Sequence, residues 1–288
     1  MREYLKLMRV KHYMKNLLIF LPAVLTRKLF EVQILKEVVI GAVIFSFASS
    51  VIYIINDIRD VEMDRQHPVK SKRPLASGKV SLPAAKTIVV FLTAAVICIW
   101  GYKKFAFEYI FIPLLYLALN VAYSLKLKEY PLIDVFILML GYVLRLIYGG
   151  RLAGTGLSAW MFLTITAAAF FLGFGKRRNE LLMYGSVGRA NLKEYTLDFL
   201  DRACQMSMTT TIIFYALSCA DVNTAVAEAG VNLLWSVPAV FIICLRYLMI
   251  LNDGKSDGDP VEVVFRDKWL ILLGIVFLAV LMILLYGS

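Results

Sequence analysis

The sequence predicts an all-α, polytopic membrane protein that forms one domain over residues 1–288. Of its 288 residues, 60% are hydrophobic, which is well above the roughly 45–50% that is typical of soluble domains. Long apolar runs recur along the whole chain, at lengths close to the ~20 residues that a helix needs to cross a bilayer. The alternating ten-residue strand pattern of a membrane β-barrel is missing from the sequence.

Nine apolar segments are predicted to be transmembrane helices. The first is the weakest candidate, because Pro22 interrupts it and basic residues flank it on both sides. Several are shorter than ~20 residues, so their ends must extend into polar flanks or they do not fully cross. In chain order the segments are Leu17–Thr26, Val38–Ile55, Thr87–Trp100, Phe105–Tyr123, Leu132–Ile147, Leu157–Phe174, Met206–Ala220, Val231–Met249 and Trp269–Tyr286.

The basic residues predict how these segments are oriented. With the N-terminus in the cytoplasm and nine crossings, 24 of the 31 lysine and arginine residues fall on the cytoplasmic side, as the positive-inside rule expects. The C-terminus is then outside, and a multi-pass position in the plasma membrane is expected. The net charge of +10 therefore reflects membrane orientation, and no nucleic-acid partner is expected.

Cysteine and histidine residues predict neither a disulfide nor a zinc site. The four cysteines are dispersed among apolar residues, so reduced thiols in the core are expected. His12 and His67 are too few and too far apart to bind zinc. A cleavable signal peptide is not expected, because no small-residue cleavage site follows the first apolar run.

The segment Asn56–Asp64, at the end of a long apolar run, carries the most informative polar residues. On an α-helix, one asparagine and three aspartates of this segment fall within a single arc of about 100°. They are Asn56, Asp57, Asp60 and Asp64. Acidic side chains are costly beside hydrocarbon, so such a cluster predicts an ionic partner.

The partner predicted for this aspartate motif is Mg²⁺. Asp57 and Asp60 lie about 4.5 Å apart along the helix axis, and Asp64 lies about 6 Å beyond Asp60. Carboxylates this close repel one another unless a positive charge lies between them. Mg²⁺ commonly takes one or two carboxylates and completes its shell with water and substrate phosphate. The alternative is an ordinary solvated helix end.

Long connections on the predicted cytoplasmic side concentrate the remaining polar residues. They span residues 56–83, 175–203 and 251–268. Connections of this length are usually functional or disordered, and their mixture of acids and bases favours a binding site. Arg73, held before Pro74, is expected to bind an anionic group such as a diphosphate.

Two shorter patterns are candidates for phosphate contacts. Tyr123 and Lys126 are three residues apart and can share a helix face, which fits either a phosphate site or an interfacial Tyr with a snorkelling Lys. Lys176 and Glu180 share a face in the same way, with Arg177 beside them.

Further charged residues lie inside or near the predicted helices. Asp134 and Arg145 share one helix face but lie about 16 Å apart along the axis, so each needs its own partner. Asp134 is expected near the cytoplasmic end of its helix, where it could face the aspartate motif, whereas for Arg145 a structural ion pair and a functional role both remain open. Asp198 and Asp201 form a second carboxylate pair. Asp259 precedes Pro260 in the pattern of a helix start and is interpreted as structural.

The pattern Asn-Asp-x-x-Asp-x-x-x-Asp at 56–64, on the second apolar segment, resembles the UbiA superfamily of membrane prenyltransferases. Several other stretches, in order, resemble its decaprenyl-phosphate phosphoribosyltransferase branch. They are Arg9–Asn16, Asp64–Pro68 with Arg73-Pro74, Tyr123–Lys126, Gly175–Arg177 with Glu180, and Glu194–Asp198. The resemblance covers nearly the whole chain and implies a UbiA-like bundle with its active site on the cytoplasmic side.

The resemblance also implies a reaction, in which a polyprenyl phosphate attacks C1 of 5-phosphoribosyl 1-diphosphate and diphosphate leaves. Asp57, Asp60 and Asp64 would be the catalytic, Mg²⁺-binding residues. The residues expected to contact substrate are Lys15, Asn16, Asn56, Arg73, Tyr123, Lys126, Asp134, Lys176, Arg177, Glu180 and Asp198. Among them, Lys15 would meet the lipid phosphate at the membrane surface, and Glu180 and Asp198 would orient ribose hydroxyls or the metal.

Two other functions are weighed against this one. Family members that prenylate aromatic rings usually carry a second aspartate-rich motif after the sixth helix, where this chain has Lys176-Arg177-Arg178. A prenyl-diphosphate-dependent transferase acting on an aromatic or haem acceptor is therefore the second hypothesis. A transporter or scaffold is the third, because few polar residues mark a path to the outside. Prenyl chain length and oligomeric state are not determined by the sequence.

Overall fold

The computed structural model describes residues 1–66, 70–103, 107–185, 190–221, 232–254, 256 and 258–287. Every regular element within these ranges is helical, as predicted. The long helices are α3 (Val32–Arg59), α5 (Leu82–Lys103), α6 (Phe107–Leu125), α7 (Ile133–Leu152), α8 (Ala159–Tyr184), α9 (Leu197–Ala220), α11 (Val237–Asn252) and α13 (Lys268–Tyr286). The short ones are α1 (Arg2–Leu7), η1 (Val10–Ile19), α2 (Leu21–Leu25), α4 (Val61–Gln66), η2 (Lys70–Lys72), η3 (Leu127–Glu129), η5 (Ala190–Glu194), η6 (Leu233–Ser236) and α12 (Pro260–Arg266).

Six of the described helical stretches are long and apolar enough to cross a membrane, so the chain is a multi-pass membrane protein. They are Val32–Arg59, Leu82–Tyr102, Ile133–Leu152, Ala159–Tyr184, Leu233–Asn252 and Lys268–Tyr286. A shorter apolar stretch, Tyr109–Leu125, falls below this length. The count of nine crossings stays a prediction. Phe105 and Val231, which begin two predicted segments, lie outside the described residues, as do His67 and Pro68.

The first predicted segment is divided between η1 and α2 instead of forming one helix. Pro22 stands in the first turn of α2, where its missing N–H costs least. The preceding ten residues, Val10–Ile19, form a 3₁₀ helix that begins after Arg9, whose backbone is left-handed with a φ of 53°. The proline therefore starts a new helix rather than kinking a continuous one.

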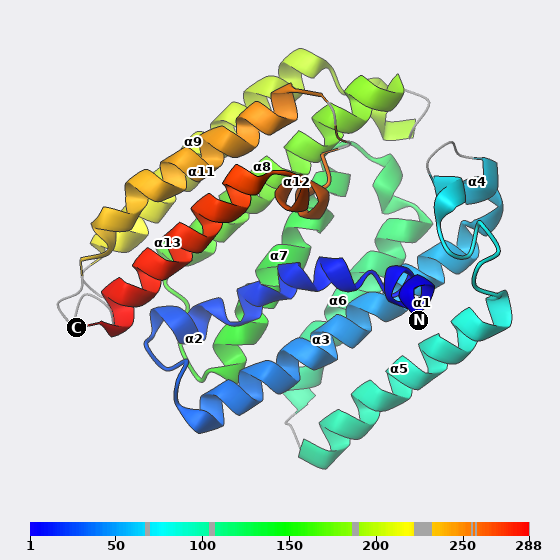
Figure 1. Ribbon diagram of the computed structural model, residues 1–288, viewed down its shortest axis with the longest axis horizontal. Helices are drawn as coiled ribbons and strands as arrows, with labels where there is room; N and C mark the ends of the chain where they lie inside the picture. The colour runs from blue at the N-terminus through cyan, green and yellow to red at the C-terminus, as the bar shows by residue number, and fades with distance from the viewer. Residues whose placement is uncertain are drawn as a thin grey trace.

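The helices form two groups with η1 between them. Figure 1 shows α9, α11, α8 and α13 on one side, α3 and α5 on the other, and α6 and α7 behind them. One buried apolar cluster joins α8, α9, α11 and α13, and another joins η1, α2, α3, α6 and α7. The short helix α12 packs onto η1 near the centre of the molecule.

Small residues let η1 lie deep between α3 and α7. Ser46 of α3 accepts a 2.7 Å hydrogen bond from Asn16, and Ser50 lies 2.7 Å from the Tyr13 hydroxyl. On α7, a Cβ atom at Gly149 would stand 2.1 Å from the Ile19 carbonyl oxygen, so only glycine permits this approach. Small residues at helix contacts are a common device in membranes, where close approach must come from packing. The polar residues of η1 are thereby placed inside the bundle.

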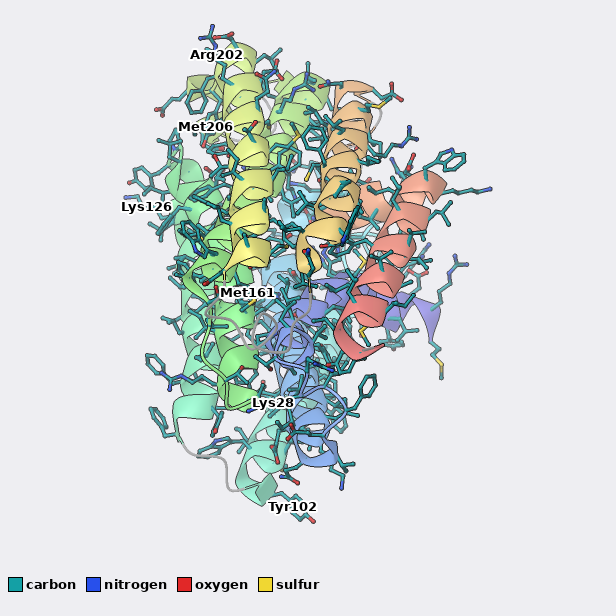
Figure 2. The ribbon with its side chains drawn as sticks, turned by 90° about the vertical axis from the view of Figure 1, so that its left-hand side faces the viewer. Lys28, Tyr102, Lys126, Met161, Arg202 and Met206 are labelled. Atoms are coloured by element: carbon teal, nitrogen blue, oxygen red, sulfur yellow. The ribbon has the colours of Figure 1, made fainter. Side chains whose placement is uncertain are left out.

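Many of the charged residues lie at one end of the bundle, where the ends of several helices meet. The last turns of α3, α6 and α8 and the first turns of α7 and α9 lie there, because the long helices alternate in direction. Figure 2 shows Arg202 at this end and Lys28 and Tyr102 at the opposite end. This is the end that the basic residues predict to be cytoplasmic.

Candidate active site

The aspartate cluster, which we define as Asp57, Asp60 and Asp64, forms where α3 passes into α4. Helix α3 ends at Arg59, and α4 restarts at Val61. The backbone N–H of Asp64 still donates to the Asp60 carbonyl at 2.8 Å, so the helical direction is nearly kept across the junction. Asp57 and Asp64 are consequently both buried, at 3% and 4% exposure, and face the same side.

Two arginines from distant segments bind these carboxylates. Nη1 of Arg73 lies 3.2 Å from Oδ1 of Asp57 and 2.7 Å from Oδ2 of Asp64, so it bridges the two side chains. Nη2 of Arg9 lies 2.7 Å from Oδ1 of Asp57, and its guanidinium stacks over the Tyr53 ring at 4.8 Å. Arg73 was expected to bind an anionic ligand, but in this structure it binds the carboxylates of Asp57 and Asp64.

A divalent metal fits this cluster by donor chemistry. Within the described ranges no three acidic, histidine or cysteine side chains converge closely enough to form a metal site by themselves. The two carboxylates that share Arg73 are still within reach of one cation, and Asp60 contributes a buried Oδ1 atom without a hydrogen-bond partner. Mg²⁺ needs no more than two protein carboxylates when substrate phosphate and water complete its shell.

The end of α6 links the aspartate cluster to a second polar group. The Ser124 hydroxyl donates a 2.7 Å hydrogen bond to Oδ1 of Asn56. Its neighbour Tyr123 points the other way, and its hydroxyl accepts a 3.1 Å hydrogen bond from Nη2 of Arg177. Two adjacent residues on one helix end therefore join α3 to α8.

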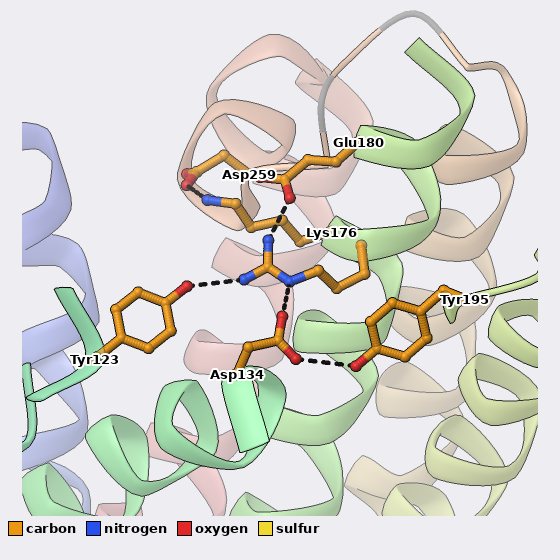
Figure 3. A network of polar contacts seen from close by, with 7 residues as sticks. Tyr123, Asp134, Lys176, Glu180, Tyr195 and Asp259 are labelled. Carbon is orange, nitrogen blue, oxygen red and sulfur yellow. Dashed lines mark hydrogen bonds and ion pairs between the residues drawn. The ribbon is translucent and has the colours of Figure 1, made fainter. Parts of the chain in front are cut away.

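The second polar group is the arginine network, which we define as Tyr123, Asp134, Arg177, Glu180 and Tyr195 (Figure 3). Arg177 is completely buried at 0% exposure. Its Nε donates to Asp134 and its Nη1 to Glu180, in addition to the bond with Tyr123. All three guanidinium nitrogens are engaged, so a buried charge is matched by two carboxylates and a hydroxyl.

Tyr195 completes the network from the segment before α9. Its hydroxyl donates to Oδ1 of Asp134 at 2.9 Å and accepts from the Leu132 backbone N–H at 2.6 Å. Burial raises the pKa of Tyr195 well above its ordinary value, so the phenol keeps the proton that it donates. Asp134, which was expected near the aspartate motif, instead contacts α8 and Tyr195.

Lys176 lies one residue before Arg177 and takes a different partner. Its Nζ is 3.0 Å from Oδ2 of Asp259, in the loop that leads into α12. Burial alone would raise the pKa of the Asp259 carboxyl, but Lys176, then Lys15 and His12, outweigh burial and hold that pKa well below its ordinary value.

Asp259 also fulfils the predicted capping role, because Oδ1 accepts a 3.0 Å hydrogen bond from the Val261 N–H. It is therefore both a helix cap and the counter-charge of Lys176.

Lys15, Asn16 and Arg145 form a third polar group, inside the bundle. Nε of Arg145 donates to Oδ1 of Asn16 at 2.6 Å, and its guanidinium lies 4.7 Å from the centre of the Phe45 ring. Nζ of Lys15 lies 5.8 Å from the centre of the Tyr142 ring. The ion pair considered for Arg145 is not formed with any described residue; its partners are neutral.

Two predicted site residues lie apart from these groups. Lys126 is exposed on the outer face of the bundle (Figure 2). Asp198 is on the exposed side of α9 and pairs at 3.1 Å with Arg202, one turn further on. Their roles toward a substrate stay predictions. The described neighbourhood supplies no contact that brings either side chain to the aspartate cluster.

The charges are distributed so that two different anionic groups can bind. The aspartate cluster with Arg9 and Arg73 carries a small negative excess, which suits a metal-bound diphosphate. Lys15, Lys176 and Arg145, against Asp259, carry a positive excess, which suits a phosphate without a metal. The aspartate cluster and Lys176 lie toward the helix ends, whereas Lys15 on η1 and Arg145 in the middle of α7 lie deeper in the bundle.

Comparison with known proteins gives the family. A model of the UbiA prenyltransferase family matches residues 18–266. The chain belongs to the UbiA prenyltransferase family. Among its relatives, a decaprenyl-phosphate phosphoribosyltransferase of Corynebacterium glutamicum is 32% identical over 98% of this chain and 86% of the relative. One of the same name from Mycolicibacterium smegmatis is 32% identical over 96% of this chain and 89% of the relative. The resemblance to this branch is confirmed, and the chain is a membrane transferase of this family.

Solved structures confirm the UbiA fold. A UbiA homolog from Archaeoglobus fulgidus bound to GPP and Mg²⁺ has a TM-score of 0.71 and 19% identity, covering 98% of this chain and 99% of that chain. The apo structure of a homolog from Aeropyrum pernix has a TM-score of 0.67 and 17% identity, covering 94% and 98%. At these identities the likeness concerns the fold alone.

The sequence reasoning assigned no function to four residues that the structure places in these groups. They are Arg9, Ser124, Tyr195 and Asp259. Arg9 and Tyr195 lie inside stretches that carry the family resemblance, but nothing in the sequence indicates which side chains they contact. Asp259 looked like a helix cap because the local pattern is complete without a second role.

Proposed function

We propose that this protein transfers 5-phosphoribose from 5-phosphoribosyl 1-diphosphate to a polyprenyl phosphate in the membrane. The supporting observation is that the ends of α3 and α8, linked through Ser124 and Tyr123 of α6, hold a carboxylate cluster and a separate cation, Lys176, at one end of the bundle. A sugar with a diphosphate at C1 and a phosphate at C5 needs two such places. The names of the full-length relatives favour the same substrates.

In this proposal Asp57, Asp60 and Asp64 would hold Mg²⁺ together with the diphosphate of the donor. The metal would neutralise the charge that develops on the leaving diphosphate. Arg73 exchanges its carboxylate partners for the diphosphate, and Arg9 keeps Asp57 in place. Electrostatic stabilisation of this kind is usually the largest contribution to catalysis.

The other donor contacts come from α8 and its neighbours. Lys176 binds the 5-phosphate as a point charge once Asp259 releases it. Arg177, with every nitrogen engaged, serves as a positioning residue that fixes α6, α7 and α8 around the ribose. Glu180, which is held by Arg177, would orient a ribose hydroxyl.

The transfer itself is a substitution at C1. An oxygen of the polyprenyl phosphate forms the new bond to C1 as the bond from C1 to the diphosphate oxygen breaks. The lipid phosphate is already anionic, so no general base is needed. Its oxygen supplies the electron pair of the new bond, and the diphosphate leaves with the pair of the broken bond. The products are polyprenyl-phosphoryl-5-phosphoribose and diphosphate.

A substrate-choice assay tests the proposal. Purified protein in detergent with Mg²⁺ is given ribose-labelled 5-phosphoribosyl 1-diphosphate and a polyprenyl phosphate, and label in the organic phase is measured. A labelled lipid that requires both substrates is expected. A parallel reaction contains a prenyl diphosphate and an aromatic acid. Product only in that reaction would overturn the proposal in favour of aromatic prenylation, and activity in neither would favour a transporter or scaffold.

A further inference from the structure

Arg145 is a buried cation inside the bundle without an acidic partner among the described residues. It stands twelve residues after the start of α7, about 18 Å along the helix, and is 4% exposed. Besides Asn16, its guanidinium donates to the Gly141 carbonyl at 2.6 Å and to the Tyr116 hydroxyl at 3.4 Å. Charged side chains at membrane depth are costly and usually mark the place of an ionic ligand when no counter-charge is built in.

Lys15 adds a second positive charge beside the first. Its Nζ lies over the Tyr142 ring, and Nη1 of Arg145 binds the carbonyl of Gly141, the adjacent residue of α7. Both cationic groups therefore lie beside the same turn of α7, and they repel each other. Within the described part of the chain Lys15 forms no ion pair at contact distance, although Asp259, which pairs with Lys176, is near enough to attract it.

A groove between exposed apolar residues reaches Asn16, the hydrogen-bond partner of Arg145. It lies between η1 and α3, has a volume of about 250 Å³, and includes Asn16, Leu17 and Val43 in its lining. Leu17 and Val43 are exposed, as lipid-facing residues are, whereas Asn16 is buried and accepts the hydrogen bond from Arg145. The cations do not line this groove, but it reaches Asn16, which is hydrogen-bonded to Arg145 and directly follows Lys15 in the chain. An apolar groove that ends beside two cations has the chemistry of a site for an anionic lipid.

We propose that Arg145 and Lys15 bind the phosphate of the lipid acceptor inside the bundle, with its polyprenyl chain in the groove between η1 and α3. This rests on the proposed function and adds to it. Lys15 was expected to meet the lipid phosphate at the membrane surface; here the phosphate binds inside the bundle instead. Arginine offers a planar fork for two phosphate oxygens, and lysine offers a point charge. The acceptor oxygen then approaches C1 from the membrane side, opposite the diphosphate at the aspartate cluster.

The 5-phosphate of the donor is also a phosphate monoester, so the test separates the two sources. The variant Arg145→Met is compared with Arg151→Met, which removes an exposed arginine from the same helix. For Arg145→Met the KM for polyprenyl phosphate should rise about tenfold or more, as for a lost hydrogen bond to a charged group, with the KM for the donor unchanged. Arg151→Met should change neither. A rise confined to the donor KM would assign the cations to the 5-phosphate and overturn the inference.

A binding measurement decides the matter independently of turnover. Polyprenyl phosphate should raise the melting temperature of the wild-type protein in detergent more than the uncharged polyprenol does, and Arg145→Met should lose that difference. An equal effect of both lipids on wild type would overturn the inference even where labelled product forms. If wild type makes no product but shows the phosphate-specific shift, the proposed reaction fails and the lipid-phosphate site stands. Should Arg145→Met not fold, Arg145→Lys replaces it in both measurements, with the same expected directions.

Discussion

Asp60 differs from the other two aspartates of the motif, because its buried Oδ1 has no hydrogen-bond partner whereas Asp57 and Asp64 are both held by arginine. A half-buried carboxylate whose buried oxygen has no partner among the described residues, in the same motif as two carboxylates held by arginine, is best explained by a ligand. Its substitution therefore separates catalysis from stability more cleanly than substitution of its neighbours.

We predict that Asp60→Asn lowers kcat/KM by about 10²–10³-fold, the size of effect seen when one group that stabilises developing charge is removed. The free energy of unfolding in detergent should stay within about 0.5 kcal/mol of the wild-type value, because Asp60 makes no side-chain bond within the described structure. Glu62→Gln, which removes an exposed carboxylate whose pair within the described ranges is the surface residue Arg65, is the matched control. An Asp60→Asn protein that does not fold would instead make the cluster a structural element.

At the scale of single residues, the sequence predicted which residues belong to the site better than it predicted which side chains they contact. The helical spacing correctly placed Asp57 and Asp64 on one side of the chain, because the junction of α3 and α4 nearly preserves the helical turn. It could not predict Arg9 as their partner, since that contact joins residues 48 positions apart. Asp134 was expected near the same motif but lies against Arg177, because the rotation of α7 within the bundle is decided by packing that one helix's sequence does not contain.

Among the elements, α6, α7 and α8 are tied together by one buried arginine. Removing Arg177 would take from the buried Asp134 and Glu180 the cation that they share, and breaking a buried ion pair is strongly destabilising. The network thus fixes the relative positions of three helix ends around the site.

For Arg177→Met we expect a loss of about 3–5 kcal/mol of stability, measured by thermal or denaturant unfolding in detergent. Arg202→Met is the control, because its pair with Asp198 is exposed and such pairs contribute about 0–1 kcal/mol. If Arg177→Met were as stable as Arg202→Met while activity disappeared, Arg177 would be a substrate ligand and not a positioning residue.

The contact of η1 with α7 gives a second prediction about elements. In Gly149→Ala the added methyl would overlap the Ile19 carbonyl, so η1 must shift, at a cost of about 1–3 kcal/mol. Gly274→Ala, in α13, has open space around the new methyl and should be neutral or slightly stabilising. Unfolding in detergent compares the two. Equal stability of both variants would contradict the depth at which η1 is placed.

The elements were predictable where hydrophobic length alone decides them and unpredictable where packing decides them. Apolar runs such as Val38–Ile55 fall inside single helices, here α3. The run Leu17–Thr26 did not become one helix, since Pro22 and the close approach at Gly149 favour a 3₁₀ segment followed by a short α-helix. The segment Asp259–Glu262 was correctly predicted as a helix start, but its contact with Lys176 depends on how α12 returns to the bundle.

For the molecule as a whole, the composition and the basic residues predicted a multi-pass helical membrane protein with its site at one end. The family likeness supports that architecture, while the number of crossings and the orientation remain predictions. The positive excess around Lys15, Lys176 and Arg145 arises from segments far apart in the chain. No single stretch of sequence contains it.

Orientation can be measured by cysteine labelling. In a background with the four native cysteines replaced by serine, Tyr102→Cys and Arg202→Cys place one thiol at each end of the bundle (Figure 2). In intact cells an impermeant maleimide should label Tyr102→Cys at once and Arg202→Cys only after permeabilisation, as the positive-inside rule requires. The reverse pattern would put the site outside the cytoplasm, away from soluble sugar phosphates.

The most direct test of the account follows the two ends of the donor separately. 5-Phosphoribosyl 1-diphosphate is prepared with ³²P either in the 5-phosphate or in the β-phosphate, and each is incubated with the purified protein, Mg²⁺ and a polyprenyl phosphate. The account predicts that the 5-phosphate label moves into the lipid while the β-phosphate label stays in water as diphosphate. Transfer of the β label to lipid, or of neither label, would contradict it.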